Sequence, residues 1–234
     1  MATLIIALDR PDAEQALDLV DRLGDAADFY KVGAELFTSA GPAVIEELRD
    51  RGKRVFLDLK YHDIPNTVAA AVRAAGALEV DLLTVHGAGG AAMLRAAADA
   101  AGPAGPRVVA VTLLTSLSAS DVEEVWGRGI SSLRGEVDRL AGLAFDAGLH
   151  GVVASPLEVE ALKRRHGAGF LVVTPGVRPA GAARDDQSRT ATAGDAARAG
   201  ADFLVVGRPV HAAPDPIAAL RALRDEIALA SEAV

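Results

Sequence analysis

The chain alternates short apolar runs with longer segments in which apolar residues recur at helical spacing. The short runs are rich in Val, Ile and Leu and lack polar alternation, which is typical of strands buried on both faces of a parallel sheet. They predict eight β-strands, over Leu4–Leu8, Phe29–Val32, Val55–Leu59, Leu82–Val85, Val108–Leu113, Gly151–Ala154, Leu171–Val173 and Phe203–Val206.

The alanine-rich segments between these strands predict helices. Strands that alternate with helices indicate an α/β fold, which we interpret as one closed (β/α)₈ TIM barrel. An open doubly wound sheet would give the same periodicity, because the pattern does not report closure. No linker or low-complexity segment divides the chain, so we expect residues 1–234 to form a single domain. The predicted helices cover Ala13–Leu23, Pro42–Arg51, Thr67–Ala75, Ala91–Ala100, Leu133–Ala147, Pro156–His166 and Pro216–Ala230.

Two predicted connections, Thr115–Ser132 and Pro175–Thr190, are longer than the usual loops of a compact domain. Long connections of this kind are commonly functional lids or insertions. The second begins at the carboxyl end of a predicted strand and is rich in Gly, Ala, Pro and Arg. We therefore expect it to be a lid that closes over a site.

The segment Val55–Thr67 carries the most informative charges of the chain, Asp58, Lys60 and Asp63. Side chains two residues apart in a strand share a face, so Asp58 and Lys60 are expected to point to the same side, with Asp63 just past the strand. Barrel enzymes keep their reacting groups at the carboxyl ends of strands, so this pattern indicates an active site. The alternative is a solvated surface ion pair.

Charged residues also occur near the ends of other predicted strands, namely Asp9, Lys31, His86 and Arg208. A closed barrel would bring them together at one rim. An array of alternating ammonium and carboxylate groups would polarise a small anionic substrate. His86 would either touch that substrate or orient the rim through hydrogen bonds.

A phosphate site is predicted after the seventh and eighth strands. Gly176 and Arg178 follow the seventh strand, and Gly207 and Arg208 follow the eighth. Loops at these places often hold phosphate through backbone N–H groups and a fixed cation, and Gln187 could add an amide donor. The alternative is that Gly207 only permits a tight turn and Arg208 is solvated.

Composition narrows the class of protein. A net charge of −8 disfavours nucleic acid as a partner. The chain has no cysteine, which removes disulfides and thiolate chemistry and fits a reducing compartment. No apolar stretch approaches the roughly 18 residues of a membrane span. We expect a globular protein of the cytoplasm that does not bind membranes.

Common metal and cofactor motifs are absent from the sequence. No two histidines stand at metal-ligand spacing, and the carboxylates at the strand ends are accompanied by lysine. The dinucleotide motif GxGxxG with its acidic residue, the P-loop GxxxxGK[ST] and the hydrolase motif GxSxG are also missing. The sequence therefore predicts neither a metal nor a cofactor.

Seven motifs spread along the whole chain are specific when taken together. They are ALD at Ala7–Asp9, KVG at Lys31–Gly33, DLKYHDIPNT at Asp58–Thr67, TVHGAGG at Thr84–Gly90, TPGVRP at Thr174–Pro179, DDQ at Asp185–Gln187 and VVGRP at Val205–Pro209. With these motifs the chain resembles the orotidine 5′-phosphate decarboxylase family. DxKxxD alone also occurs in related barrels that act on sugar phosphates.

The resemblance implies a homodimeric decarboxylase without metal or cofactor that converts orotidine 5′-phosphate to UMP, the last step of de novo UMP synthesis. It implies that Lys60 donates a proton to C6 within a chain of alternating charges formed with Lys31, Asp58 and Asp63. The active sites would lie at the dimer interface.

The resemblance also implies a substrate-binding set. Asp9 and Lys31 would hold ribose hydroxyls, and Thr115 would lie near the base. Asp63 and Thr67 would reach into the partner subunit's site. The phosphate side would be formed by Arg178, Gln187, Gly207 and Arg208, and the remaining members of the set are Ile64 and Pro175.

Two other functions fit part of the pattern. A Mg²⁺-dependent decarboxylase or aldolase of sugar phosphates would share the barrel and would be sensitive to chelators. A catalytically silent sensor would bind UMP tightly without turning over orotidine 5′-phosphate. The segments DIPNT, TPGVRP and DDQ favour the nucleotide enzyme.

Overall fold

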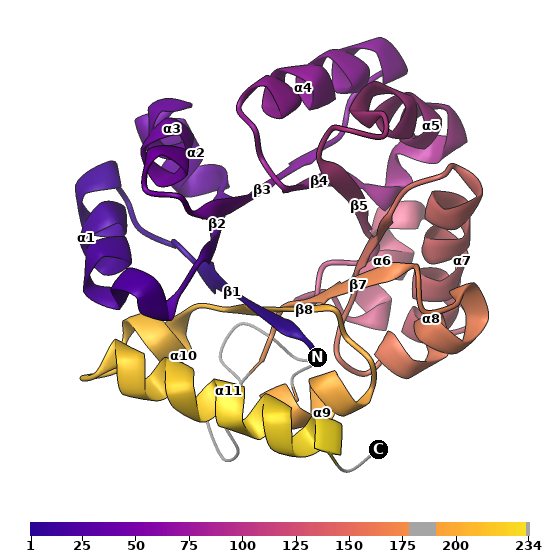
Figure 1. Cartoon of the computed structure of the whole chain (residues 1–234). Coiled ribbons are helices and arrows are strands. Elements are labelled where there is room, and N and C mark those ends of the chain that lie inside the picture. Colours follow the sequence, from indigo (N-terminus) through magenta and orange to yellow (C-terminus); the bar gives the residue numbers. More distant parts are fainter. Residues whose placement is uncertain (178–190, 233–234) are drawn as a thin grey trace.

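The computed structural model describes residues 1–177 and 191–232 and contains a closed barrel of parallel strands. The strands pair in sequence order, and β1 pairs with β8 to close the sheet (Figure 1). This confirms the predicted (β/α)₈ barrel and excludes the open doubly wound sheet. The strands are β1 (Thr3–Ala7), β2 (Phe29–Gly33), β3 (Arg54–Tyr61), β4 (Leu82–His86), β5 (Arg107–Val111), β6 (Gly151–Val153), β7 (Leu171–Thr174) and β8 (Phe203–Val206).

Helices surround the barrel as an outer ring (Figure 1). All seven predicted helices are present, with shifts of up to three residues at their ends. The described helices are α1 (Ala13–Leu23), α2 (Ala34–Ala40), α3 (Ala43–Asp50), α4 (Pro65–Ala77), α5 (Gly90–Ala101), α6 (Ala119–Trp126), α7 (Leu133–Asp146), α8 (Val159–His166), α9 (Ala193–Arg198), α10 (Arg208–His211) and α11 (Pro216–Glu232). Short 3₁₀ turns cover Gly24–Ala26 and Gly87–Gly89.

The strands bury both of their faces, in two separate hydrophobic clusters. Along β1, Ile5 and Ala7 point into the barrel, whereas Leu4 and Ile6 pack outward against helices. This is the alternation expected of a strand, and helices on the outside explain why no polar alternation is visible in the sequence. The inner cluster consists of Ile5, Ala7, Phe29, Phe56, Leu82, Val109, Val173, Phe203 and Val205.

The connection from Thr115 to Ser132, predicted as a long loop, contains helix α6. The Ser118 side chain accepts a hydrogen bond from the Asp121 backbone N–H, and the Asp121 side chain accepts one from the Ser118 N–H, which forms a capping box. Gly127 ends the helix in the left-handed region at φ 62°. These local signals form a short helix that the hydrophobic pattern did not predict.

A charge cluster around one buried carboxylate ties this connection to α7. Glu136 on α7 has a side chain only 8% exposed, and it accepts hydrogen bonds from Arg128 at 2.9 Å and Arg139 at 2.8 Å. Both guanidinium groups also lie over the Trp126 ring, at 5.1 and 5.3 Å from its centroid. Because the carboxylate is paired on both oxygens, the cluster holds the end of α6 and the residues after it against α7.

Other boundaries differ from the sequence prediction for local reasons. Helix α4 starts at Pro65 rather than Thr67, because proline suits the first helical position, where its missing N–H is not needed. Strand β3 runs past Leu59 to Tyr61, with a register shift against β4 between Leu57 and Tyr61. The short helices α2, α9 and α10 were not predicted. No helix among the described residues has the length and apolar character needed to cross a membrane.

Candidate active site

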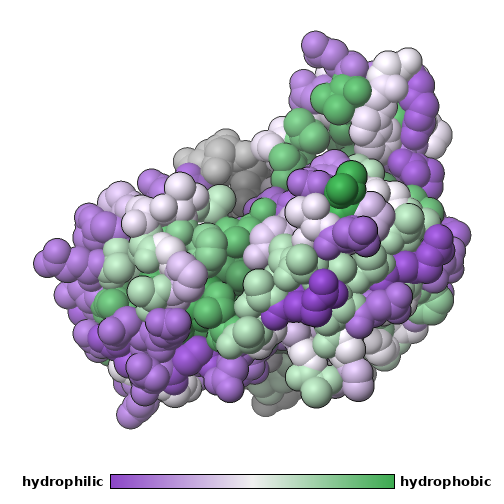
Figure 2. Space-filling model, turned by 90° about the horizontal axis from the view of Figure 1, so that it is seen from above, coloured by the Kyte–Doolittle hydropathy of each residue, from purple (hydrophilic) through white to green (hydrophobic). Residues whose placement is uncertain are grey.

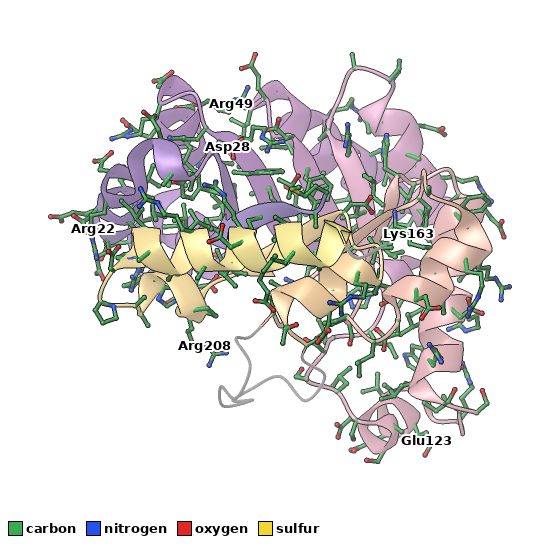
Figure 3. All side chains as sticks on the ribbon, turned by 60° about the horizontal axis from the view of Figure 1, so that its bottom comes forward. Arg22, Asp28, Arg49, Glu123, Lys163 and Arg208 are labelled. Carbon is green, nitrogen blue, oxygen red and sulfur yellow. The ribbon has the colours of Figure 1, made fainter. Side chains whose placement is uncertain are left out.

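A pocket of about 250 Å³ lies at the carboxyl ends of the barrel strands. Figure 3 shows Arg208 at the same end of the barrel as Glu123 of α6, whereas Asp28 and Arg49 lie toward the opposite end. The floor of the pocket is apolar and includes Phe56 from the inner cluster. Its polar and backbone lining comes from residues that the sequence analysis singled out, namely Asp9, Lys31, Asp58, Lys60, Thr115, Pro175, Gly176, Gly207 and Arg208.

Four charged side chains in this pocket form a continuous chain of ion pairs. Lys60 Nζ lies 3.0 Å from Asp58 Oδ1, and Lys31 Nζ lies 3.7 Å from Asp58 Oδ2. Lys31 Nζ also lies 3.0 Å from Asp9 Oδ1. The Asp58 and Lys31 side chains are only 14% and 12% exposed, whereas Lys60 is 38% exposed. The arrangement therefore presents the Lys60 ammonium to the pocket, with a buried carboxylate behind it.

The backbone at Lys60 departs from a regular strand. Its φ is +52°, a region that L-residues with a side chain rarely adopt. Asp58 and Lys60 do line the same pocket, as predicted, but simple alternation along a regular strand does not place them there. The irregular end of β3 brings the two side chains within hydrogen-bond distance of each other.

Thr84 contacts two members of the ion-pair chain, and it is not among the predicted site residues. Its hydroxyl donates to Asp58 Oδ1 at 3.0 Å and accepts from the Lys60 N–H at 2.9 Å. The signal available was its position, because Thr84 stands two residues after the inward-facing Leu82 on β4.

Three predicted site residues, Asp63, Ile64 and Thr67, lie outside this pocket and are exposed. Asp63 accepts a hydrogen bond from the Ile64 N–H at 2.6 Å, and the Ile64 side chain is 67% exposed. Within one chain, Asp9 rather than Asp63 is the second carboxylate of the ion-pair chain. Arg178, Gln187 and most of the predicted lid fall outside the described residues.

His86 lies at the end of β4 but does not line the pocket. Its ring stacks on His62, with centroids 5.1 Å apart, and its Nδ1 accepts a hydrogen bond from the Ala88 N–H. Burial, together with the charges of His62 and Lys60, lowers the pKa of His86. The neutral ring is therefore favoured, which agrees with a role in shaping the loop after β4.

Close packing explains two glycines at the rim. A Cβ on Gly207 would lie 3.3 Å from Asp9 Oδ2 and 3.5 Å from Ala7 Cβ. A Cβ on Gly33 would lie 3.0 Å from Lys31 Nζ. Both positions let the backbone approach the ion-pair chain, which a larger residue would disturb.

Carboxylates and lysines thus alternate in the pocket. Among the described residues, no group of three or more His, Asp or Glu side chains is arranged to hold a metal ion. Both pocket carboxylates already contact an ammonium group. The arrangement is suited to stabilising negative charge that develops beside Lys60.

The closed barrel and its charged pocket at the carboxyl ends of the strands define the protein as a (β/α)₈-barrel enzyme. Residues 2–223 match the family model described as "Orotidine 5'-phosphate decarboxylase / HUMPS family". The chain belongs to this family and is a carboxy-lyase.

Relatives and solved structures agree with this assignment. The chain is 53% identical to orotidine 5′-phosphate decarboxylase of Moorella thermoacetica, over 96% of this chain and 91% of that protein. It is 55% identical to the enzyme of the same name from Halorhodospira halophila, over 97% and 96% of the two chains. The crystal structure of orotidine 5′-phosphate decarboxylase from Lactobacillus acidophilus superposes with a TM-score of 0.87 at 39% identity, covering 97% of this chain and 99% of that one.

Proposed function

We propose that this enzyme decarboxylates orotidine 5′-phosphate to UMP, the last step of de novo UMP synthesis, with Lys60 as the proton donor to C6. The observation that carries the proposal is the Lys60 ammonium in the pocket, 3.0 Å from the nearly buried carboxylate of Asp58. The relatives named for this reaction support the choice of substrate. We propose further that the chain acts as a single catalytic domain of the cytoplasm that needs no metal or cofactor.

The chemistry requires a cation at the reacting carbon. Loss of CO₂ from C6 leaves a carbanion whose lone pair lies in the ring plane, so the pyrimidine π-system cannot delocalise it. An ammonium group beside C6 stabilises this charge and then transfers a proton to it. Asp58 holds the Lys60 ammonium in place through their ion pair, and the Lys31 ammonium balances the charge of Asp58.

Repulsion between an Asp carboxylate and the substrate carboxylate is a smaller contribution. Two like charges about 4 Å apart interact by about 4 kcal/mol at an effective dielectric of 20, which corresponds to about three powers of ten in rate. Enzymes commonly lower barriers by about 8 to 23 kcal/mol. Repulsion alone would therefore be insufficient, and we favour stabilisation of the transition state by Lys60 as the larger contribution to the rate.

The rest of the pocket would bind the remainder of the nucleotide. Asp9 and Lys31 would hold the ribose hydroxyls, Thr115 would lie near the base, and Pro175 would also bind the substrate. Gly207 and Arg208 would bind the phosphate at the β8 end of the pocket, together with Arg178 and Gln187. Phosphate binding far from C6 can contribute to catalysis by closing the predicted lid, Pro175–Thr190, over the pocket and excluding water.

The exposed residues Asp63, Ile64 and Thr67 fit a role at a dimer interface. They lie just before α4 and in its first turn, a few residues after the pocket residue Lys60, and burial of the exposed Ile64 side chain against a partner would be favourable. Figure 2 shows that hydrophobic residues gather in a hollow on the side of the molecule that is uppermost in Figure 1, where α4 lies. We propose that two copies pack through this side and that Asp63 and Thr67 complete the partner subunit's site.

The decisive experiment follows the loss of orotidine 5′-phosphate absorbance after exhaustive EDTA treatment. We expect turnover by the wild type and its loss in Lys60→Ala, whereas Lys163→Ala, which removes a lysine paired with Asp202 outside the pocket, stays active. A folded wild-type protein without turnover would contradict the proposal. Activity that needs Mg²⁺ would favour a sugar-phosphate enzyme, and tight UMP binding without turnover would favour a sensor.

A further inference from the structure

Thr84 occupies the inner face of β4 directly behind the ion-pair chain. It is fully buried, and it does not line the pocket. Its position after Leu82 on the inward-facing side of the strand places it one layer above the apolar barrel interior. A polar side chain in such a place needs hydrogen-bond partners, and Thr84 finds both of them on β3.

The hydroxyl of Thr84 makes two hydrogen bonds, one as acceptor and one as donor, to two different groups. It accepts from the Lys60 backbone N–H at 2.9 Å and donates to Asp58 Oδ1 at 3.0 Å. The same Asp58 oxygen accepts from Lys60 Nζ at 3.0 Å. A single hydroxyl thus connects the backbone of Lys60 to the carboxylate that holds the head group of Lys60.

The Lys60 backbone needs such a connection. Its φ of +52° places it in the left-handed region, and β3 loses its register against β4 between Leu57 and Tyr61. At this irregularity the Lys60 N–H bonds to a side chain rather than to a backbone carbonyl of β4. The unusual conformation is maintained only where the surroundings fix it.

We propose that Thr84 is a positioning residue for the decarboxylation: its hydroxyl holds the Lys60 backbone and the Asp58 carboxylate in the one arrangement that aims the ammonium into the pocket. This inference rests on the proposed role of Lys60. Thr84 touches no substrate, so its loss should affect the chemical step and leave substrate binding nearly unchanged.

The test compares Thr84→Val, which keeps the shape and removes the hydroxyl, with Thr84→Ser, which keeps the hydroxyl. We expect kcat for orotidine 5′-phosphate to fall about ten- to a hundredfold in Thr84→Val, with KM changed less than about threefold. Thr84→Ser should stay within about threefold of the wild type, because its hydroxyl can make both hydrogen bonds.

Thr112→Val is the matched control. Thr112 is also fully buried, follows the end of β5, and donates to the Val153 carbonyl at 2.9 Å without touching the ion-pair chain. The Thr112→Val protein should be less stable than the wild type but should keep a kcat close to the wild-type value. The proposal is overturned if Thr84→Val keeps the wild-type kcat, if Thr84→Ser is as slow as Thr84→Val, or if Thr112→Val loses the same factor in kcat.

A second measurement does not depend on activity. Removing the acceptor should speed hydrogen exchange of the Lys60 amide at least about tenfold in Thr84→Val, and Thr84→Ser should keep exchange slow. An unchanged exchange rate would overturn the positioning role even if the wild type proved to act on another substrate. If Thr84→Val does not fold, Thr84→Ala removes the same hydroxyl without a new buried methyl group, and the same criteria apply.

Discussion

Lys60 Nζ lies 3.0 Å from Asp58 Oδ1, and the two residues stand two positions apart in β3. The contact depends on the irregular end of the strand, where Lys60 takes a positive φ. The ammonium consequently faces the pocket while the carboxylate remains 14% exposed behind it. Substitutions at these residues and at their neighbours should therefore distinguish the effect of removing a charge from the effect of moving it.

Asp58→Asn should lower kcat at least about a hundredfold, because an amide of the same size cannot balance two ammonium groups. Steady-state kinetics with orotidine 5′-phosphate measures the effect. Asp28→Asn is the control, since Asp28 pairs with Arg54 at 3.0 Å toward the opposite end of the barrel (Figure 3). Equal activity of the two variants would contradict a role for Asp58.

Gly33→Ala should reduce kcat/KM about tenfold, because the added Cβ would lie 3.0 Å from Lys31 Nζ and displace the ammonium. The backbone tolerates alanine there, since φ is −94°. Gly142→Ala in α7 is the control: apart from its chain neighbours and the adjacent helix backbone, no atom lies within 4 Å of the added Cβ, so activity should persist and stability rise by about 0.5 to 1 kcal/mol. Wild-type kcat/KM in Gly33→Ala would show that Lys31 can move without consequence.

Arg208→Gln should raise KM about ten- to a hundredfold for orotidine 5′-phosphate, because a charge-assisted hydrogen bond to the phosphate is lost. The same variant should react with phosphate-free orotidine as the wild type does, which isolates the phosphate contact. Arg22→Gln, on α1 and outside the pocket, should leave KM unchanged. An equal loss with both substrates would argue against a phosphate role.

Mixing inactive Lys60→Ala and Asp63→Ala proteins should restore activity after subunit exchange. Half of the dimers would be mixed, and each of these has one site with both residues intact, so recovery should approach about a quarter of the wild-type activity. Native mass spectrometry would show whether exchange occurred. Proven exchange without recovery would refute the shared site.

Stability should fall as the pH drops through the titration of His150. Burial and then the charge of Arg107 lower the pKa of this group, and its Nδ1 accepts from the Val108 N–H at 3.0 Å. As the pH falls, His150 is therefore protonated in the unfolded chain before it is protonated in the folded protein. The stability that the neutral ring contributes is fully present above about pH 6.5 and is lost as the pH falls through the folded-state pKa.

His150→Asn keeps an acceptor for Val108 but does not titrate, so it should weaken the pH dependence. Urea unfolding at about pH 5.5 and about pH 8 measures the change, and the value at the higher pH removes the cost of the substitution itself. A variant with the pH dependence of the wild type would contradict the assignment to His150.

The sequence was sufficient to predict the barrel, because the strands are short apolar runs and each predicted helix has apolar residues at helical spacing. It missed α6, where Ser118 and Asp121 begin a helix through local capping rather than through an apolar stripe. It also missed α2, a seven-residue helix too short for a clear period.

The pocket residues could be predicted because charges stand out at the ends of apolar strands, as at Asp9 and Lys31. The partnership of Thr84 with Lys60 could not be predicted, since it depends on a strand irregularity and a pairing 24 residues apart in the sequence. The proposed roles of Asp63 and Thr67 depend on a second subunit, which the pattern of one chain cannot position.

The pairing of β1 with β8 sets the order in which the candidate active site can form. Leu4 pairs with Leu204, so Asp9 and Arg208 become neighbours of one pocket only when the last strand joins the first. Contacts so distant in sequence form late and slowly, because a long loop must close. A chain still emerging from the ribosome can contain the complete lysine–aspartate segment of β3 and yet have no place to bind a nucleotide.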